Sequence, residues 1–362
     1  GLGLAFVNAR LLALAEIANT DRESRRIGAQ TAVATMVVLA LGAPVLWIAY
    51  RANEARHVVA NVFATGSGDP LFVPAGGDGA AEAVETILFF GGDAGPGRWG
   101  LRTDTMILVT VDKQSGRTAL VSIPRNLSRL EFPPGTPLAV TFPTGFDDLA
   151  NAVFPYVSTR PDLLEFYGAN GLQAEPVALS QAIGHSLDVQ IDDFALVNMQ
   201  GFTDVIDAVG GVTLELAANV PLPPSLPGER PLPASIGPGP VEMDGALAIA
   251  YARSRSADSD YQRMGRQRQL LAALGSQVSA SEALGGFSEV TGVLEDSMRT
   301  SLSSNEFSGL LDRLGDNAAV IESVGLIPPL VEPGSPDYST IRQIIDAVRN
   351  AVVTGEPSGY AN

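Results

Sequence analysis

Short apolar runs separated by turn residues dominate the chain after residue 84. Three of them are strand-like: ETILFFG ends at Gly91, TMILVTVD ends at Asp112, and TALVSIP ends at Pro124. The polar residues 113–116, KQSG, separate the second run from the third and predict a tight hairpin. The three runs are therefore expected to be strands of one sheet.

Helical and strand-like patterns then alternate along the rest of the chain. Helices are predicted at 180–187, 201–211, 244–252 and 262–278, and strands at 189–199, 212–217 and 324–327. A Pro-rich loop is expected at 221–240. Because strands and helices are interleaved, the pattern predicts an α/β fold, a three-layer αβα sandwich with a central mixed sheet.

Residues 27–50 differ from everything else, since they form one long apolar run without a formal charge. Such a run is long enough to cross a bilayer core of about 30 Å as a helix. Pro44 is tolerated in membrane helices, and Trp47 and Tyr50 lie where aromatic residues collect at a membrane interface. The alternative is a buried core helix. Arginines are more numerous before the run than just after it, which favours an extracytoplasmic C-terminal part.

Composition changes along the chain divide it into six parts. The expected organisation is a cytoplasmic or membrane-associated segment at 1–26, a transmembrane helix at 27–50, a linker at 51–84, a main domain at 85–280, a helical part completing that domain at 281–354, and a disordered tail at 355–362.

Charge and composition exclude several classes of function. The formal net charge of −17 argues against general affinity for nucleic acid or for anionic lipid. Cysteine is absent, which excludes disulfides, thiolate catalysis and cysteine-based zinc sites. His57 and His185 lie far apart without metal-ligand spacing, so histidine catalysis is not expected. Since basic residues are scarce, clusters of them are informative.

The densest basic cluster is YARSRSADSDYQRMGRQRQ, at residues 251–269. Its arginines are at positions 253, 255, 263, 266 and 268. Arg263 and Gln267 are four residues apart, so they share a face of the predicted helix. Arg253 and Arg255, in a connecting loop, would converge with Arg263 on a polyanion. The alternative is a solvated charged face in which Asp258 and Asp260 pair with neighbouring arginines.

A second candidate site joins the first two predicted strands. Gly91-Gly92-Asp93 ends one strand, and Arg102-Thr103-Asp104 opens the next. Two carboxylates at adjacent strand ends suit Mg²⁺, which takes one or two carboxylates and leaves its other positions to water and substrate phosphates. Turn-forming Asp and Gly residues are the alternative. Arg102 would bind the same phosphate or form a local ion pair with Asp104.

A third, weaker signal is SIPRNLSR at residues 122–129. The strand that ends at Ile123-Pro124 delivers Arg125 to the edge of the sheet, where α/β proteins often place ligand sites.

Taken in order, these segments resemble the LytR-CpsA-Psr family of cell-wall ligases over residues 87–277. The family has a Gly-x-Asp turn, an Arg-Ser-Asp-Thr strand start, a Ser-Ile-Pro-Arg-Asp strand end and a Tyr-x-Arg-x-Arg…Asp-x-x-Arg-x-x-x-Gln stretch. Here these read Gly91-Gly92-Asp93, Arg102-Thr103-Asp104-Thr105, Ser122-Ile123-Pro124-Arg125-Asn126, and Tyr251 to Arg255 followed by Asp260, Arg263 and Gln267. Asn126 replaces the usual Asp, and Asn151 matches a recurrent Asn of the family.

The resemblance implies a membrane-anchored phosphotransferase whose catalytic domain lies outside the cell membrane. It would move a glycopolymer from a polyprenyl diphosphate carrier to peptidoglycan. Asp93 and Asp104 would hold Mg²⁺. The diphosphate would be bound by Arg102, Arg125, Arg253, Arg255, Arg263 and Gln267. Arg102, Arg125, Arg255 and Arg263 would also act in catalysis, and Asp260 would orient or deprotonate the acceptor or pair with Arg263.

Two other functions stay open from the sequence. A pyrophosphatase of the same lipid would use the same site with water as the acceptor. A non-catalytic envelope-assembly or scaffold protein would keep the fold without needing the metal site. The Pro/Gly-rich style and the preference for arginine are typical of an actinobacterial member of the family.

Overall fold

The structure is a computed structural model that describes residues 69–77, 79–80, 82–92, 103–225, 230–254, 259–277, 297–303, 306, 309–310 and 320–362. The chain divides into two compact units, Gly1–Arg56 and His57–Asn362, and all described residues belong to the second unit. The expected membrane segment at 27–50 lies outside the described residues, as do Asp93, Arg102 and Arg255. Across the described ranges, no helix is both long enough and apolar enough to span a bilayer.

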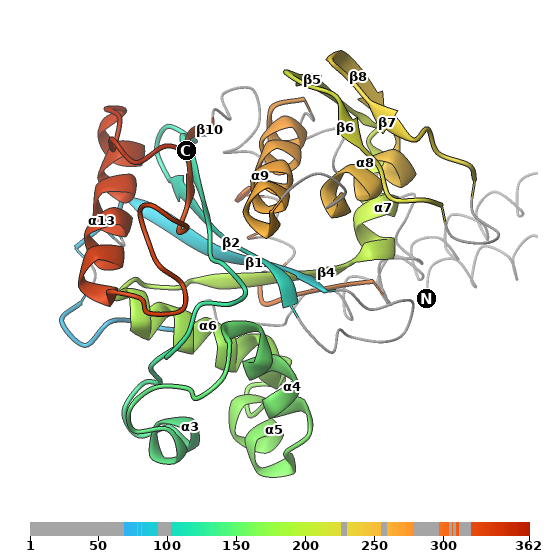
Figure 1. Ribbon diagram of the computed structural model, residues 1–362. Helices are drawn as coiled ribbons and strands as arrows, with labels where there is room; N and C mark the ends of the chain where they lie inside the picture. Colours follow the sequence, from blue (N-terminus) through green and yellow to red (C-terminus); the bar gives the residue numbers. More distant parts are fainter. Residues whose placement is uncertain are drawn as a thin grey trace, which may run out of the picture. The chain divides into compact units, whose positions relative to one another are not determined.

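A six-stranded mixed sheet forms the centre of the second unit (Figure 1). Its strand order is β10-β3-β2-β1-β4-β9. Strands β2 and β3 form the predicted antiparallel hairpin, and β1 is antiparallel to β2. Strand β4 runs parallel to β1, and β10 runs parallel to β3. The strands are β1 (Val84–Gly92), β2 (Thr103–Asp112), β3 (Thr118–Ser122), β4 (Asp193–Asn198), β9 (Met298–Thr300) and β10 (Val320–Gly325).

Alternating side chains of β1 face two different layers. Leu88 and Phe90 join one large hydrophobic cluster with helices α6 (Ala174–Leu187) and α13 (Tyr338–Thr354). Phe89 points to the opposite face, where it lines a pocket together with residues of α9 (Asp260–Gln277). The predicted α/β fold with a central mixed sheet and packed helices is confirmed.

A smaller lobe has its own hydrophobic cluster. It contains α7 (Met199–Ala208), β5 (Val212–Leu216), β8 (Gly239–Met243) and α8 (Gly245–Arg253), with β6 (Val220–Pro221) paired to β7 (Ser235–Ile236). Strand β5 pairs with β8 and does not extend the central sheet. Its side chains alternate between buried and exposed, which is the pattern of a sheet with one covered face. The expected loop at 221–240 thus contains β7 and the start of β8.

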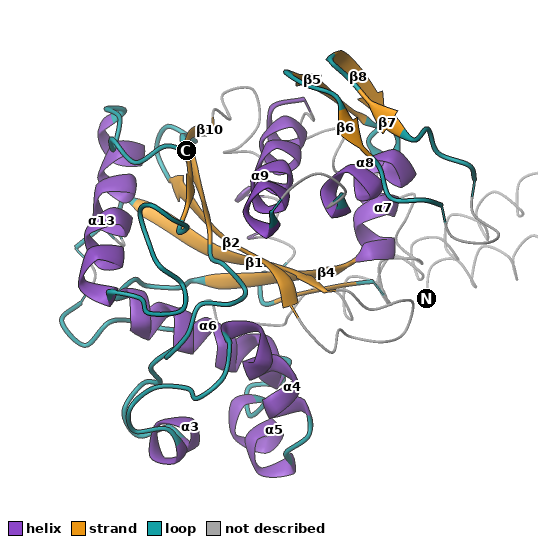
Figure 2. Cartoon of the chain, in the orientation of Figure 1, coloured by secondary structure: helices purple, strands orange, loops and turns teal. Residues whose placement is uncertain are grey.

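Short helices occupy residues 137–167, for which the sequence predicted no helix, and the last two of them pack against α6 (Figure 2). The first, α3, begins at Pro137 after Thr136, whose side chain accepts a hydrogen bond from the Ala139 amide at 3.3 Å. Pro is well placed in a first helical turn, because no intrahelical donor is lost there. The short helices are α3 (Pro137–Thr141), η1 (Ala150–Ala152), α4 (Val153–Ser158) and α5 (Pro161–Tyr167).

The C-terminal part at 281–354 was expected to be helical apart from a strand at 324–327. It supplies β9, β10 and α13, and β10 overlaps the predicted strand. Strand β10 lies at one edge of the sheet, and α13 follows it. The expected disordered tail at 355–362 instead makes defined contacts with β10. The Ser358 amide donates to Glu322 Oε1 at 2.7 Å, and Asn362 Nδ2 donates to the Gly325 carbonyl at 3.1 Å.

Candidate active site

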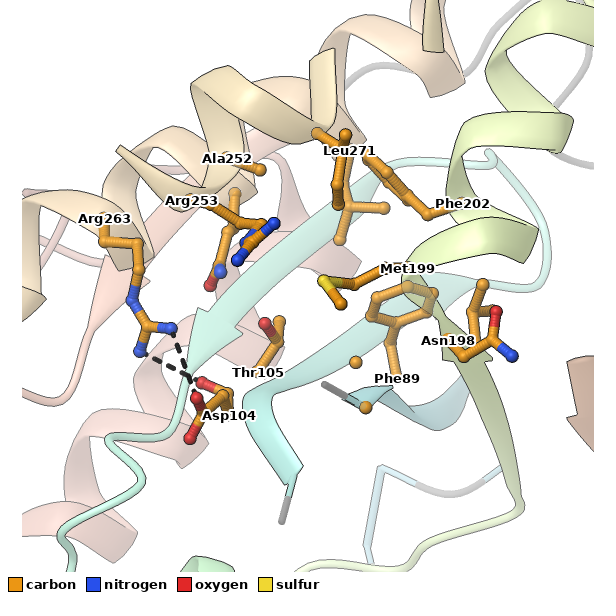
Figure 3. Close-up of a pocket in the computed structure, with 15 residues that line it drawn as sticks. Phe89, Asp104, Thr105, Asn198, Met199, Phe202, Ala252, Arg253, Arg263 and Leu271 are labelled. Atoms are coloured by element: carbon orange, nitrogen blue, oxygen red, sulfur yellow. Dashed lines mark hydrogen bonds and ion pairs between the residues drawn. The ribbon is translucent and has the colours of Figure 1, made fainter. Parts of the chain in front are cut away.

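A pocket of about 360 Å³ lies where β1 and β4 end and β2 begins (Figure 3). Ligand crevices of α/β proteins commonly form at the carboxyl ends of parallel strands, and β1 and β4 are such a pair. Gly91 lies in its wall, and a Cβ atom there would come within 2.8 Å of Thr105 Cβ. Only glycine therefore lets β1 and β2 pass this closely at the pocket.

Asp104 is the centre of the polar end of the pocket. Arg125 Nη1 donates to Asp104 Oδ1 at 2.8 Å. Arg263 Nη2 donates to the Asp104 carbonyl at 3.2 Å, and Arg263 Nη1 lies 3.9 Å from Asp104 Oδ2. These contacts bring together one residue from β2, one from the loop after β3 and one from α9. Figure 3 shows the contacts between Asp104 and Arg263.

Asp260 shares the same two arginines. Arg125 Nε lies 3.2 Å from Asp260 Oδ2, and Arg263 Nη2 lies 3.1 Å from both oxygens of Asp260. Burial alone would lower the pKa of Arg125, but the hydrogen bonds and negative charges of Asp104 and Asp260 outweigh it and raise that pKa. Both guanidinium groups therefore stay charged at any physiological pH. Two carboxylates and two guanidinium groups form a compact network that is neutral overall.

Two more polar groups reach the pocket from neighbouring helices. Arg253 is the last residue of α8, and Gln267 lies one turn after Arg263 on α9. Arg253 was predicted to lie in the connecting loop, but α8 extends through Arg253, so this prediction is wrong. Helix α8 begins at Asp244, whose side chain accepts from the Leu247 amide at 2.9 Å. None of the described carboxylates pairs with Arg253, so its charge is available to a ligand.

The other half of the pocket is apolar, and the sequence did not identify it. It is built by one face of β1, the end of β4, the first turn of α7 and the inner faces of α8 and α9 (Figure 3). Its apolar side chains are Phe89, Val197, Met199, Phe202, Ile249 and Leu271. Leu271 of α9 is one of the residues that line it. The polar and apolar halves together suit an amphiphilic ligand with an anionic head.

Most of the predicted site residues lie together. The structure brings Asp104, Arg125, Arg253, Asp260, Arg263 and Gln267 to one end of one pocket or into direct contact with its polar residues. The other three candidates, Asp93, Arg102 and Arg255, lie outside the described residues.

Asn151 completes the surroundings of Asp104. Its Nδ2 donates to Asp104 Oδ1 at 3.5 Å, and its main-chain amide donates to the Arg125 carbonyl at 3.2 Å. The Asn151 side chain is buried, and its Oδ1 has no hydrogen-bond partner. A buried acceptor of this kind next to a carboxylate is a suitable neighbour for a hard cation or its bound water.

The described residues fit Mg²⁺ held by few protein ligands. Within the described ranges, no group of three or more acidic or histidine side chains could hold a metal ion. Asp104 supplies one carboxylate, and Mg²⁺ in phosphate-binding sites commonly needs only one or two. The donor set fits an ion shared between the protein and a phosphorylated ligand.

Comparisons with known proteins identify the family of the chain. The profile of the LytR_cpsA_psr family matches residues 73–327. Biofilm regulatory protein A of Streptococcus mutans is 27% identical over 66% of this chain and 53% of its own length. Polyisoprenyl-teichoic acid–peptidoglycan teichoic acid transferase TagU of Bacillus subtilis is 28% identical over 60% of each chain. Probable cell wall biosynthesis protein LcpB of Corynebacterium glutamicum is 31% identical over 54% of this chain and 37% of its own. The chain spans less than two thirds of the length of each of these relatives.

Solved structures share the fold. The crystal structure of Bacillus subtilis TagV is similar with a TM-score of 0.51 and 20% identity, covering 77% of this chain and 98% of TagV. The crystal structure of Bacillus subtilis TagT is similar with a TM-score of 0.51 and 20% identity, covering 80% of this chain and 99% of TagT.

Proposed function

Because this chain belongs to the LytR_cpsA_psr family, we propose that it transfers a glycopolymer, through its phosphate, from a polyprenyl diphosphate carrier to peptidoglycan. The names of TagU and TagV of Bacillus subtilis describe transfer of a polyisoprenyl-linked teichoic acid to peptidoglycan, which supports the proposal. The observation that carries it is the two-part pocket, with Arg253, Arg263 and Gln267 at one end and an apolar wall at the other.

This pocket matches the chemistry of a lipid diphosphate. The diphosphate is an anion that Arg253 and Arg263 would bind by charge-assisted hydrogen bonds. The hydrocarbon next to it would lie on the apolar wall, where its removal from water stabilises binding by about 25 cal/mol per Å². A free sugar phosphate would use only the polar half of the pocket. The apolar half therefore favours a lipid-linked donor.

The reaction would be a substitution at the phosphorus that bears the glycan. A sugar hydroxyl of peptidoglycan attacks this phosphorus, the new P–O bond forms, and the bond to the bridging oxygen breaks, so that polyprenyl phosphate leaves. Phosphoryl transfer depends mainly on positioning and on neutralising charge. Arg253, Arg263 and Gln267 would hold the diphosphate, with Arg102 and Arg255 as further proposed contacts.

The carboxylates have separate proposed roles. Asp104, with Asp93, would hold Mg²⁺, which supplies neutralisation of phosphate charge when it is bound. Asp260 orients Arg125 and Arg263 through the contacts described above. The same carboxylate would accept the proton of the attacking hydroxyl once a phosphate has taken its place on the arginines.

The cellular arrangement is part of the same proposal. Residues 27–50 would be the single membrane-spanning helix, preceded by 1–26 and followed by a linker to residue 84. The catalytic domain at 85–280, completed by 281–354, would lie outside the cell membrane, where peptidoglycan is found. Apolar length and flanking arginines support this arrangement.

The test is release of polyprenyl phosphate from a synthetic polyprenyl diphosphate-linked sugar by the full chain in detergent, with and without Mg²⁺. Wild-type protein should release it in a Mg²⁺-dependent way, and Asp104→Ala and Arg255→Ala should not. Wild-type inactivity with several lipid lengths in the presence of peptidoglycan would reject the transferase and favour a scaffold. Equal release without peptidoglycan, with the sugar phosphate found free, would identify a pyrophosphatase.

A further inference from the structure

Helix α9 carries three buried arginines. Arg263, Arg266 and Arg268 are 4%, 6% and 4% exposed. A buried guanidinium group is costly unless its donors are used, so each of the three should have a structural or functional reason. Arg263 belongs to the pocket. Arg268 reaches the other way, where its Nε donates to Ser323 Oγ of β10 at 2.8 Å and its Nη2 donates to the Asn362 carbonyl at 3.0 Å.

Arg266 contacts the end of the neighbouring helix. Its Nη2 donates to the carbonyl of Ser254, the C-cap residue that directly follows α8. A cation at this position is favourable twice, because it satisfies a terminal carbonyl and complements the negative end of the helix dipole. Its Cζ lies 6.0 Å from the centre of the Tyr251 ring, within the range of a cation–π contact.

Ser254 is held from several directions. Its amide donates to the Tyr251 carbonyl at 3.2 Å, and its hydroxyl donates to the carbonyl of Pro221 in β6. Tyr251 in turn donates from its hydroxyl to Gln269 Oε1 of α9 at 2.7 Å. Both Ser254 and Tyr251 are 1% exposed. The end of α8 is thus attached to α9 through one charged and one neutral hydrogen bond.

The attachment lies directly next to the pocket. Arg253, which precedes Ser254, comes from α8, whereas Arg263 and Gln267 come from α9. These groups converge only while the two helices keep their relative placement. We propose that Arg266 is a positioning residue that fixes the end of α8 on α9, so that Arg253 and Arg263 bind one diphosphate together. The identity of the ligand in this inference rests on the proposed function. The role of Arg266 in fixing the end of α8 is independent of it.

A matched pair of variants tests the proposal in the full chain. Arg266→Met and Arg268→Met remove the same charge from two buried positions of one helix, and only the first position contacts Ser254. Binding of inorganic pyrophosphate and of a short-chain polyprenyl diphosphate is measured by calorimetry, with thermal unfolding measured alongside. Arg266→Met should weaken both affinities about tenfold or more, since small displacements of phosphate-binding groups have large effects. Arg268→Met should change them less than about threefold, and Arg266→Lys should recover part of the loss.

Equal effects of Arg266→Met and Arg268→Met on affinity, in proportion to their loss of stability, would overturn the proposal, as would unchanged affinity in Arg266→Met. The second readout needs no ligand: native-state trypsin cleavage after Arg253 should be faster in Arg266→Met than in Arg268→Met. If wild-type protein binds neither diphosphate, the proposed function fails, and the cleavage rates alone decide whether Arg266 holds the end of α8. Equal cleavage rates would overturn the positioning role.

Discussion

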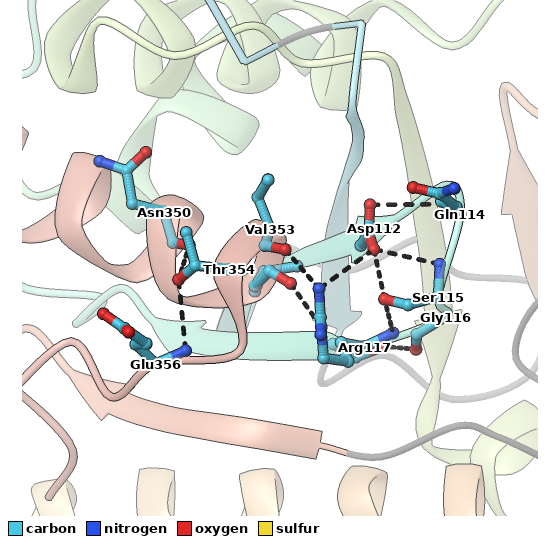
Figure 4. Close-up of polar contacts among 11 residues, drawn as sticks. Asp112, Gln114, Ser115, Gly116, Arg117, Asn350, Val353, Thr354 and Glu356 are labelled. Atoms are coloured by element: carbon cyan, nitrogen blue, oxygen red, sulfur yellow. Dashed lines mark hydrogen bonds and ion pairs between the residues drawn. The ribbon is translucent and has the colours of Figure 1, made fainter.

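The two ends of the central sheet both contain arginine paired with aspartate, and they use the pair differently. At the pocket end, Arg125 and Arg263 contact the carboxylates of Asp104 and Asp260. At the opposite end, Arg117 lies in the connection between β2 and β3, directly before β3, and its Nη2 lies 3.6 Å from Asp112 Oδ2 (Figure 4). The residue types are the same, but the remaining donors of the arginines go to different partners.

Arg117 uses its donors on main-chain carbonyls. Its Nε donates to the Val352 carbonyl at 2.8 Å, and its Nη2 donates to the Val353 carbonyl, both in the last turn of α13. Asp112 accepts from the Ser115 amide at 3.0 Å and thereby closes the hairpin (Figure 4). A soluble anion could displace these partners only by opening the helix end or the turn.

The arginines at the pocket end have exchangeable partners. The carboxylates of Asp104 and Asp260 can move when a phosphate approaches, because their side chains are 22% and 29% exposed. The comparison shows that arginine–aspartate pairing alone does not identify a binding site. A binding arginine has side-chain partners that a ligand can replace, and it lies next to a pocket that can admit the ligand. Variants at the two ends should separate function from stability.

The largest effect is expected for Arg263→Ala. It removes one of the two arginines that join Asp104 to Asp260 and a proposed contact of the diphosphate, so polyprenyl phosphate release should fall about 100-fold or more. Single-turnover assays of the full chain measure it, and Arg263→Lys should stay well below wild type because it lacks the planar fork. Near-normal turnover in Arg263→Ala would show that this arginine does not act on the diphosphate.

Arg117→Met should show the opposite behaviour at the other end of the sheet. It loses two hydrogen bonds to the C-terminal turn of α13, so the free energy of unfolding should fall by about 2–3 kcal/mol. Turnover per folded molecule should not change, because the pocket lies at the other end of the strands. Denaturant unfolding and activity at low temperature measure the two quantities. A large loss of turnover without loss of stability would contradict the distinction.

Asp193 lies at the start of β4, at the end of the sheet opposite the pocket, and it should make the stability of the protein depend on pH. Burial raises the pKa of Asp193 from 3.8 to about 7, although Ser301 Oγ donates to its Oδ1 at 2.7 Å. The folded state therefore binds a proton that the unfolded state has lost, and wild-type stability should decline as the pH rises from about 4 to about 7. Asp193→Asn should remove this decline and exceed wild-type stability above about pH 7, by on the order of 2 kcal/mol. The free energy of unfolding of both proteins is measured against pH. If it changes with pH equally in the two, Asp193 is not the source of the decline.

Leu271→Gln should have the smallest effect, and it should distinguish the apolar half of the pocket from the polar half. A polar group on the apolar wall should weaken binding of a polyprenyl diphosphate about fivefold. Binding of inorganic pyrophosphate, which uses only the polar end, should stay the same. If both ligands lose affinity equally, Leu271 acts through the structure of α9 and not through contact with the lipid.

The strands of the central sheet were largely predictable because their apolar runs are bounded by turn residues. The hairpin at 113–116 and the strand β4 follow from local pattern, whereas the parallel pairing of β4 with β1 does not. Strand β8 was missed because it begins with Gly239 and Pro240, which are typical of loops. Its stability comes from pairing with β5. Helices α3 to α5 were missed because they are short, although Thr136 before Pro137 is a recognisable helix start.

The charged half of the site was predictable and the apolar half was not. Arginines are conspicuous in an acidic chain, so Arg125, Arg253 and Arg263 could be identified from clustering and from the family resemblance. Phe89 and Phe202 look like ordinary core residues in the sequence. Their exposure to the pocket results from the way α7 meets the end of β1, which is a tertiary property that no local pattern contains.

The position of β10 has a consequence for how the protein matures. β10 comes from residues 320–325, yet it completes the sheet beside β3, whose own residues are 118–122. During synthesis, a chain that emerges N-terminus first must keep the edge of β3 unpaired for some two hundred residues. Arg268 of α9 also contacts Ser323 of β10, so the helix that carries Arg263 acquires this support only after β10 has been synthesised. Premature termination before β10 should therefore yield an aggregation-prone product, because the edge of β3 then has no partner strand.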